Sequence, residues 1–160
     1  MSQLENSFRR ALLRVLPFWP LHVLLKAYYH AAIRLAVFLL KRIPDIQAVY
    51  VTGSFARDEV IYGLSDIDLT VFFNNRGTGG SYNRIYVVLR GIYLAFPMFG
   101  DVSEKGIFPV ESFLSDWRNS RSMQYLFDDN FHPHHLVWGR DVLKELHPQM
   151  LGGYSPCSVY

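Results

Sequence analysis

Two short hydrophobic segments near the middle of the chain are separated by a mixed, turn-rich stretch. Residues 49–52 are β-branched or aromatic, a pattern that predicts a buried strand. Gly53 and Ser54 interrupt this strand, and residues 55–61 have the length of about two helical turns, which predicts a short helix. In residues 66–73 apolar side chains return at alternate positions, which predicts a second strand. The alternation turns three of its side chains toward a core: Ile67, Leu69 and Val71.

Elsewhere in the chain, apolar residues recur at helical spacing, and prolines mark where several segments stop. The pattern predicts helices at residues 1–16, 21–42, 82–96 and 110–129, the last with a break near Asn119 and Ser120. A further helix is predicted to begin near Asp141 as its N-cap and to run through Leu146, with Pro148 ending it. The glycine-rich residues 74–81 lack the Gly-Lys-Ser ending of a P-loop and predict a flexible connection.

The helix predicted at residues 21–42 carries a polar stripe along an otherwise apolar surface. His22, Lys26, His30 and Arg34 recur every fourth residue and therefore follow one row of the helix. A membrane-spanning helix disfavours permanent charges near its middle, so we expect a core helix that packs by its apolar surface. A helix that lies on a membrane surface is the main alternative.

Size and composition are consistent with one folded domain. The chain has 160 residues, of which 50% are hydrophobic, enough to form a core and to exclude global disorder. We assign residues 1–150 to a single domain and residues 151–160 to a flexible C-terminal tail. The net charge of +2 is too small to indicate a nucleic-acid partner by itself. The lone cysteine, Cys157, excludes an internal disulfide and fits a reducing cytoplasm.

A pair of carboxylates at the start of the second strand carries the candidate chemistry. Asp66 and Asp68 are two residues apart, so on a strand their side chains point to the same side. Carboxylates so close repel each other unless a cation lies between them, and oxygen ligands favour Mg²⁺. Gly53 lets the backbone approach a ligand closely, and the turn at Ser54 would lead into a helix whose free N–H groups favour an anion. The stretch therefore predicts a phosphate-binding turn beside a metal-binding pair.

With Gly-Ser at residues 53–54 and Ser-Asp-Ile-Asp-Leu at residues 65–69, the chain resembles the DNA polymerase β-like nucleotidyltransferase superfamily. The wording GSFAR followed by SDIDL is most similar to the minimal nucleotidyltransferases, and the resemblance extends over residues 46–110, the expected catalytic core. Many relatives have glycine where this chain has Asp58, which we expect to alter the conformation and charge of the loop without loss of the site. The resemblance implies an α+β fold, in which helices flank a small mixed, α/β-like sheet and one of them is the N-terminal amphipathic helix.

The resemblance also implies roles for individual residues. In the superfamily a third carboxylate lies on a strand beside the Asp-x-Asp strand, and Asp101 is the candidate, with Glu104 as the alternative. Asp101 could instead cap a turn after Gly100. Together with Asp66 and Asp68, Asp101 would hold two Mg²⁺ ions and act in catalysis. The residues expected to bind the nucleotide are Gly53, Ser54, Arg57 and Lys105, although a surface role is equally open for Arg57.

The activity implied by the resemblance is transfer of a nucleoside monophosphate, with AMP from ATP favoured, to a hydroxyl group. The acceptor is a protein, a small molecule or a nucleic acid, and a partner protein or an oligomer is compatible with the sequence. We expect a cytoplasmic protein without a membrane partner. Two alternatives belong to other classes: a catalytically inactive module that binds a nucleotide or a partner with the same fold, and a membrane-associated adaptor that uses the long apolar helix.

Three histidines close together invite a zinc hypothesis. His132, His134 and His135 surround Pro133, and adjacent histidines at this spacing do not share a face easily. No cysteine or suitably spaced carboxylate joins them, so a zinc site is disfavoured.

Overall fold

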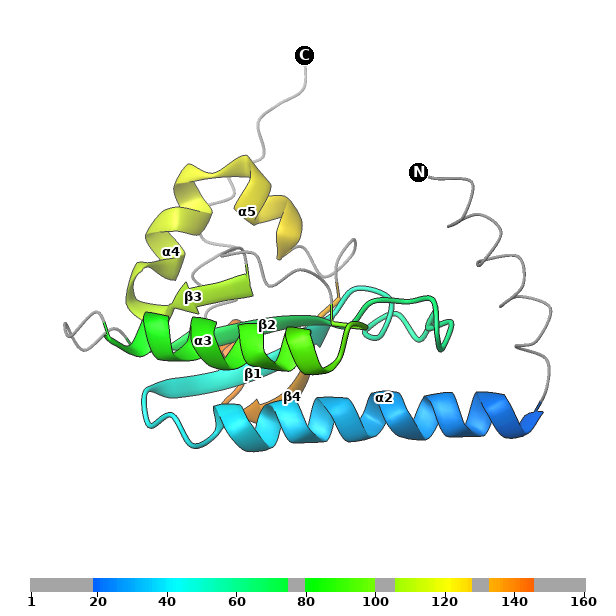
Figure 1. The fold of residues 1–160 in the computed structure, drawn as a ribbon. Coiled ribbons are helices and arrows are strands. Elements are labelled where there is room, and N and C mark those ends of the chain that lie inside the picture. The colour runs from blue at the N-terminus through cyan, green and yellow to red at the C-terminus, as the bar shows by residue number, and fades with distance from the viewer. Residues whose placement is uncertain (1–18, 75–79, 100–105, 128–132, 146–160) are drawn as a thin grey trace, which may run out of the picture.

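The computed structural model describes residues 19–74, 80–99, 106–127 and 133–145 (Figure 1). In chain order the elements are α2 (Trp19–Leu40), β1 (Ile46–Thr52), β2 (Asp68–Phe73), α3 (Gly80–Ala95), β3 (Ile107–Pro109), α4 (Val110–Asn119), α5 (Arg121–Leu126) and β4 (His135–Gly139). The helix predicted at residues 1–16 and the tail at residues 151–160 lie outside the described residues.

The strands form one mixed sheet in the order β3-β2-β1-β4. β1 pairs antiparallel with β2 and with β4, whereas β2 pairs parallel with β3. The predicted α+β fold with a small mixed sheet and flanking helices is confirmed. Both predicted central strands are present, but β2 begins at Asp68, so Asp66 precedes the strand. β3 was not predicted, because its 3 residues are too few to show an alternating pattern.

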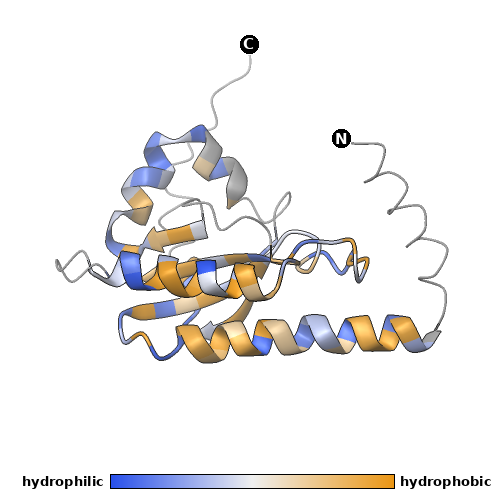
Figure 2. Cartoon of the chain, viewed as in Figure 1, coloured by the Kyte–Doolittle hydropathy of each residue, from blue (hydrophilic) through white to orange (hydrophobic). Residues whose placement is uncertain are grey.

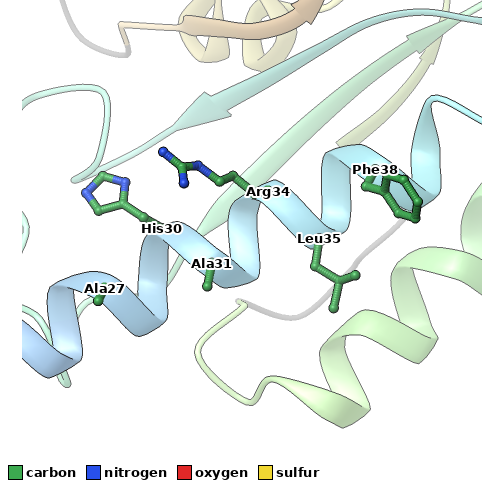
Figure 3. A pocket seen from close by; sticks show the side chains of 6 residues that line it. All are labelled: Ala27, His30, Ala31, Arg34, Leu35 and Phe38. Atoms are coloured by element: carbon green, nitrogen blue, oxygen red, sulfur yellow. The ribbon is translucent and has the colours of Figure 1, made fainter.

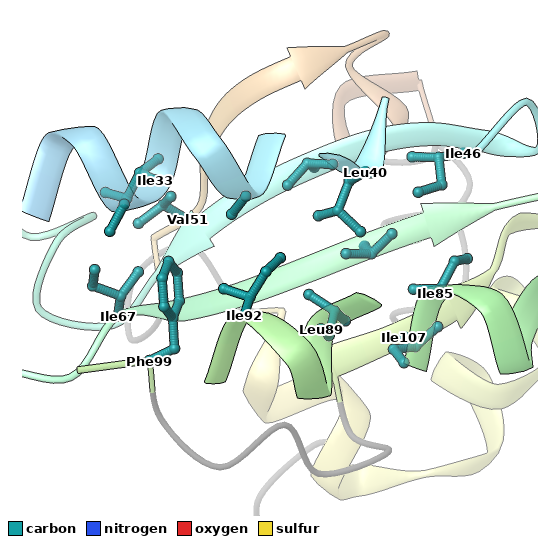
Figure 4. Close-up of a cluster of buried hydrophobic side chains, with 14 of the residues drawn as sticks. Ile33, Leu40, Ile46, Val51, Ile67, Ile85, Leu89, Ile92, Phe99 and Ile107 are labelled. Carbon is teal, nitrogen blue, oxygen red and sulfur yellow. The ribbon is translucent and has the colours of Figure 1, made fainter. Parts of the chain in front are cut away.

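One face of the sheet is covered by α2 and α3, and the side chains between them are mostly aliphatic (Figure 4). The long predicted helix is present as α2, and its buried residues recur at helical spacing: Tyr29, Ala32, Ile33, Ala36 and Leu40. α3 adds Ile85, Leu89 and Ile92. From β2 and the residue before it, Val71 and Ile67 are buried in this cluster and Leu69 packs against it, as the alternation predicted.

The opposite face is covered by α4 and α5, and its core is mainly aromatic (Figure 1). Phe72 of β2 lies at the centre, with the ring of Phe113 at 5.0 Å in an edge-to-face contact and the ring of Phe127 at 5.9 Å. His134 stacks on Phe127 at 4.9 Å, so this histidine is part of the aromatic packing. His132 lies outside the described residues. The helix predicted over residues 110–129 is divided at Ser120, as expected.

A buried tyrosine ties the end of β4 to the centre of the sheet. The hydroxyl of Tyr50 donates to Asp141 Oδ1 at 3.0 Å and accepts the backbone N–H of Leu143 at 3.1 Å. Asp141 Oδ1 also accepts the N–H of Lys144 at 3.2 Å, which confirms Asp141 as the N-cap of the helical turn that follows.

α2 is apolar on more than its buried face. From Pro20 to Tyr28 no described side chain is buried, and Leu24 is 67% exposed. Figure 2 shows hydrophobic residues at both ends of the helix, with polar residues between them. Within the described part of the chain, Pro20–Leu40 has the length and hydropathy that a membrane span would need. Its inner residues nevertheless pack in the core of the domain, as expected for a core helix.

Candidate active site

The predicted carboxylates lie at the end of the sheet where β1 stops and β2 begins. Thr52, the last residue of β1, pairs with Asp68, the first residue of β2. Gly53 follows directly on this pair, and Asp66 lies two residues before β2. Sheet register therefore brings the Gly-Ser turn next to Asp68, the second aspartate of the Asp-x-Asp segment.

Gly53 and the Asp68 carboxylate are packed so closely that a side chain at residue 53 would displace the carboxylate. Gly53 has φ +68°, in the left-handed region, and a Cβ added there would lie 2.5 Å from Asp68 Oδ2. The group that approaches Gly53 is the carboxylate of Asp68, and the close approach of a ligand to this glycine stays a prediction. The glycine thus leaves the space that this side chain occupies.

The environment of Asp68 disfavours the negative charge of its carboxylate. Loss of solvent around the carboxylate raises its pKa above the ordinary 3.8, and the negative charge of Asp66 raises it further, while Arg57 acts in the opposite direction. Asp66 thus acts on Asp68 through its negative charge, but it precedes β2, so the pairing of the strands does not itself place its side chain. A cation placed between them would relieve the repulsion.

The two carboxylates fit a divalent metal as part of its ligand set. Both offer hard oxygen donors, and Mg²⁺ is commonly held by one or two carboxylates together with substrate phosphates. Across the described ranges there is no cluster of three or more His, Cys, Asp or Glu side chains that could hold a metal ion. Asp66 and Asp68 therefore suit a site that is completed by further oxygen ligands.

The loop between the strands differs from the prediction, because the helix expected at residues 55–61 is not formed. The Arg57 N–H donates to the Gly53 carbonyl at 3.3 Å, and the Glu59 N–H donates to the Ser54 carbonyl at 2.9 Å. These bonds close a single turn that ends as helix C-termini often do, with one residue in the left-handed conformation. That residue is Asp58, with φ 56°. The helix N-terminus that was expected to favour an anion is therefore not formed, and the candidate groups for a phosphate are the Gly53 backbone and the Ser54 hydroxyl.

Asp58 is the residue at which the resemblance to the superfamily led us to expect an altered conformation and charge of the loop. Its left-handed backbone is the conformation that glycine adopts without strain. Aspartate is one of the few other residues that tolerate this region, so Asp58 keeps the backbone conformation that glycine would adopt. The expected change of conformation is therefore wrong, while the added negative charge is present.

Arg57 lies on the exposed side of the same turn. Its Nε donates to Glu59 Oε2 at 2.8 Å in an exposed ion pair. Arg57 also lies near enough to Asp68 to lower the pKa of that carboxyl. Glu59 was not predicted as a partner, and its contact keeps the guanidinium beside the candidate site without burying it.

The loop is anchored on α2 by a group of aromatic side chains that the sequence did not reveal. The Tyr29 hydroxyl donates to the Ser65 carbonyl at 2.9 Å and accepts the Gly63 N–H at 3.0 Å. The Tyr29 ring stacks on Phe55 at 5.8 Å and meets Tyr62 edge-on at 5.4 Å. No local pattern could have indicated these contacts, because they join residues about thirty positions apart.

Three predicted residues, Asp101, Glu104 and Lys105, lie outside the described residues. The described chain on either side of them lies against β2. The Ile67 N–H donates to the Met98 carbonyl at 2.7 Å, and Phe99 forms a parallel bridge with Ile67. Gly106 lies so close to β2 that a Cβ there would be 2.6 Å from the Leu69 carbonyl oxygen.

A shallow, open groove runs along the exposed surface of α2 (Figure 3). His30 and Arg34 project from one side of the helix, while Leu35 and Phe38 lie on the side toward α3. Ala27 and Ala31 complete its lining, and neither candidate carboxylate is part of it. The groove is nevertheless adjacent to the loop, because the His30 ring contacts Phe55 and Tyr62, each at 6.3 Å.

Comparison with protein families matches residues 33–116 to the nucleotidyltransferase domain, a match that covers more than half of the chain. The chain belongs to the nucleotidyltransferase domain family. The matched part of this nucleotidyltransferase domain begins at Ile33 in α2 and ends in α4. It therefore includes both carboxylates and the Gly-Ser turn. No curated protein and no solved structure matches the chain.

Proposed function

We propose that this domain is a Mg²⁺-dependent nucleotidyltransferase that moves a nucleoside monophosphate to a hydroxyl group of an acceptor, with AMP from ATP as the favoured donor reaction. Family membership supports nucleotidyl transfer in general. The observation that carries the more specific proposal is the environment of the Asp68 carboxylate. This group lies against Gly53, and the negative charge of Asp66 contributes to its raised pKa.

The reaction joins the acceptor oxygen to the α-phosphorus of the nucleotide. As that bond forms, the bond from the α-phosphorus to the bridging oxygen breaks, and pyrophosphate leaves with its electron pair. The divalent cations that the two aspartates would hold, two in our proposal, would supply a lower pKa for the acceptor hydroxyl and charge neutralisation for the pyrophosphate. Asp66 and Asp68 would hold these ions, while the Gly53 backbone and the Ser54 hydroxyl contact the triphosphate.

A third carboxylate would take the proton that the acceptor hydroxyl loses. Asp101 is our candidate, and it follows Phe99, which pairs with the residue between the two aspartates. Carboxylates positioned at the acceptor side of such a metal site commonly serve as general bases. Arg57 and Lys105 are proposed to contact the phosphates, Arg57 from its position near Asp68.

The acceptor belongs to one of three classes: a protein, a small molecule or a nucleic acid. ATP as donor and the absence of an internal disulfide both fit action in the cytoplasm. The identity of the acceptor is accessible by labelling, since the product carries the α-phosphate of the donor.

The test is incubation of the purified protein with each α-³²P-labelled nucleoside triphosphate, Mg²⁺ and cell lysate. We expect one lysate component to become labelled, and we expect Asp66→Ala and Asp68→Ala each to lower the labelling rate at least about 100-fold, because the cations lose their ligands. Asp116→Ala is the matched control, since Asp116 is exposed on α4, on the opposite face of the sheet. Full labelling by both site variants would show that the assignment is wrong.

A second candidate is a domain that binds the nucleotide without transferring it. It differs from the first candidate in lacking a third carboxylate that acts on the acceptor, and our candidate for that group, Asp101, lies outside the described residues. Under this alternative, Asp68→Ala weakens binding of Mg²⁺–ATP in calorimetry, yet no lysate component is labelled by the unmodified protein. Labelling of a lysate component by the unmodified protein would exclude this alternative, and loss of that labelling in Asp101→Asn would then assign Asp101 to the acceptor side.

A further inference from the structure

Tyr29 is buried on the inner face of α2, with 3% of its surface exposed, and its hydroxyl lies under the loop that precedes Asp66. The hydroxyl uses both of its hydrogen-bonding functions there. It donates to the Ser65 carbonyl at 2.9 Å and accepts the Gly63 N–H at 3.0 Å. One side-chain oxygen thus bridges two backbone groups that lie on either side of Leu64.

The Ser65 carbonyl belongs to the peptide group that joins Ser65 to Asp66. Because a peptide group is planar, a bond that fixes this carbonyl also fixes the orientation of the Asp66 N–H and the direction in which the chain enters Asp66. On the other side, the Ile67 N–H is fixed by its bond to the Met98 carbonyl at 2.7 Å. Asp66 is therefore held between two anchored peptide groups, although it lies outside β2.

The Tyr29 ring contacts both arms of the same loop. It stacks on Phe55, which directly follows Ser54, with ring centroids 5.8 Å apart. It also meets the edge of Tyr62, just before Gly63, at 5.4 Å. A single side chain of α2 thus connects the arm that carries the Gly-Ser turn with the arm that carries Asp66.

The hydroxyl is also close to the Asp66 charge. The pKa of Tyr29 is raised, chiefly by burial and further by the negative charge of Asp66, while its bond from the Gly63 N–H acts in the opposite direction. This agrees with the hydrogen bonds in placing the phenol beside the base of the carboxylate. The hydrogen of the Tyr29 hydroxyl is used on the Ser65 carbonyl, so it is not available to donate to a nucleotide phosphate.

We propose that Tyr29 is a positioning residue for Asp66: through the Ser65–Asp66 peptide it sets the distance between the Asp66 carboxylate and Asp68, and so the affinity of the pair for a divalent cation. This inference rests on the proposed function in one respect, namely that Asp66 is a metal ligand. Groups that orient metal ligands from outside the coordination shell commonly affect metal affinity strongly when they are removed.

Tyr29→Phe tests the proposal because it removes the hydroxyl and keeps the ring between Phe55 and Tyr62. The matched control is Tyr50→Phe. Tyr50 is equally buried, at 1% exposed, and its hydroxyl likewise donates to one oxygen and accepts one backbone N–H, but on the aromatic face of the sheet. Both variants lose the same chemical group and both should unfold at a lower temperature than the parent protein.

The first readout is binding of Mn²⁺ to the metal-free protein, followed by electron paramagnetic resonance of the free ion at a temperature where all variants are folded. We expect Tyr29→Phe to weaken Mn²⁺ binding about tenfold and to raise the half-activating Mg²⁺ concentration of transfer to a similar extent. Tyr50→Phe should leave both quantities within twofold of the parent, about the precision of such titrations. A second readout needs no metal: the Gly63 amide should exchange its hydrogen faster in Tyr29→Phe alone.

The outcomes separate this inference from the proposed function. If Asp66→Ala and the parent protein bind Mn²⁺ equally, Asp66 is not a ligand, and both proposals are overturned. If Asp66→Ala loses binding while Tyr29→Phe keeps it, only the positioning role is overturned. If Tyr29→Phe and Tyr50→Phe weaken binding to the same extent, the effect is one of general stability, and the positioning role is again overturned.

Discussion

The two carboxylates of the candidate site are positioned by different parts of the structure. Asp68 is the first residue of β2, its backbone is paired with Thr52, and its side chain lies against Gly53. Asp66 lies outside the strand, at the end of a loop whose last peptide group is held by Tyr29, 36 residues earlier than Ser65. We call these the strand side and the loop side of the site. The strand side depends on sheet register within one short motif, whereas the loop side depends on how α2 packs against the loop.

This difference indicates which substitutions should affect the proposed nucleotidyl transfer. A substitution in α2 can displace Asp66 without touching the motif, as proposed for Tyr29. Asp68 should respond only to changes in the motif or in the sheet itself. The predictions below test the strand side first, where we expect the largest effect, and then the turn that connects the two sides.

The largest effect is expected for Gly53→Ala, a substitution on the strand side of the site. The new methyl group would lie 2.5 Å from Asp68 Oδ2, and the backbone has φ +68°, which costs an L-residue about 1–2 kcal/mol. A displacement of the carboxylate by about 1 Å should lower the rate of nucleotidyl transfer by about 100-fold or more. The measurement is the transfer rate in the labelling assay, with circular dichroism to confirm that the sheet is retained.

Gly91→Ala is the control for Gly53→Ala. Gly91 lies within α3, and a Cβ there has nothing within 4 Å. Alanine should stabilise this helix by up to about 1 kcal/mol and leave transfer unchanged. Equal activity of the two alanine variants would mean that the close packing of Gly53 on Asp68 has no role in the site.

A second prediction concerns the charge of Asp68 and the stability of the fold. The pKa of this carboxyl is raised in the folded protein, so the folded state binds the proton more tightly than the unfolded state does. Stability from this group is therefore lost as pH rises from the ordinary value of 3.8 through the raised pKa, and it stays lost at higher pH. Asp68→Asn cannot lose a proton, so it should be inactive but melt at a higher temperature than the parent at about pH 7.

The melting temperatures of the parent protein and Asp68→Asn are compared at two pH values, with a chelator that removes divalent ions. At about pH 3, where the carboxyl is protonated in both states, the advantage of Asp68→Asn should disappear. Added Mg²⁺ should stabilise the parent and not the variant, because only the parent keeps both ligands. A gap in melting temperature that is equal at both pH values would contradict the assignment of a disfavoured charge at Asp68.

The smallest effect is expected at Asp58, in the turn between the two sides. Asp58 has φ 56°, a conformation that glycine adopts freely. Asp58→Gly should be more stable than Asp58→Ala by about 1 kcal/mol, because both lose the charge and only glycine loses the strain. Urea denaturation measures the difference, and transfer should change little in the glycine variant. If alanine is as stable as glycine at this position, the turn does not need a left-handed residue.

Some features of the fold follow from local pattern and were predictable. The alternation of Ile67, Leu69 and Val71 predicted which face of β2 enters the aliphatic core, and the structure confirms it. The helix break at Ser120 and the cap at Asp141 were also predicted, because short polar side chains there satisfy backbone groups within a few residues.

Other features were not accessible to such reasoning. Residues 55–61 have the length of a helix, yet the chain forms one turn that ends at Asp58 and continues as a loop packed on α2. β3 exists as a strand because β2 offers it a parallel partner, and its own 3 residues carry no pattern.

By itself, the sequence determined the strand side of the site. Thr52, Gly53 and Asp68 lie within one motif, and antiparallel pairing of two hydrophobic strands is enough to bring the glycine and the carboxylate together. Only the tertiary structure decided the loop side. Asp66 has no strand to fix it, so its position depends on a hydroxyl from α2 and on the chain that passes beside Ile67, and contacts at such separations arise only when the whole domain has folded.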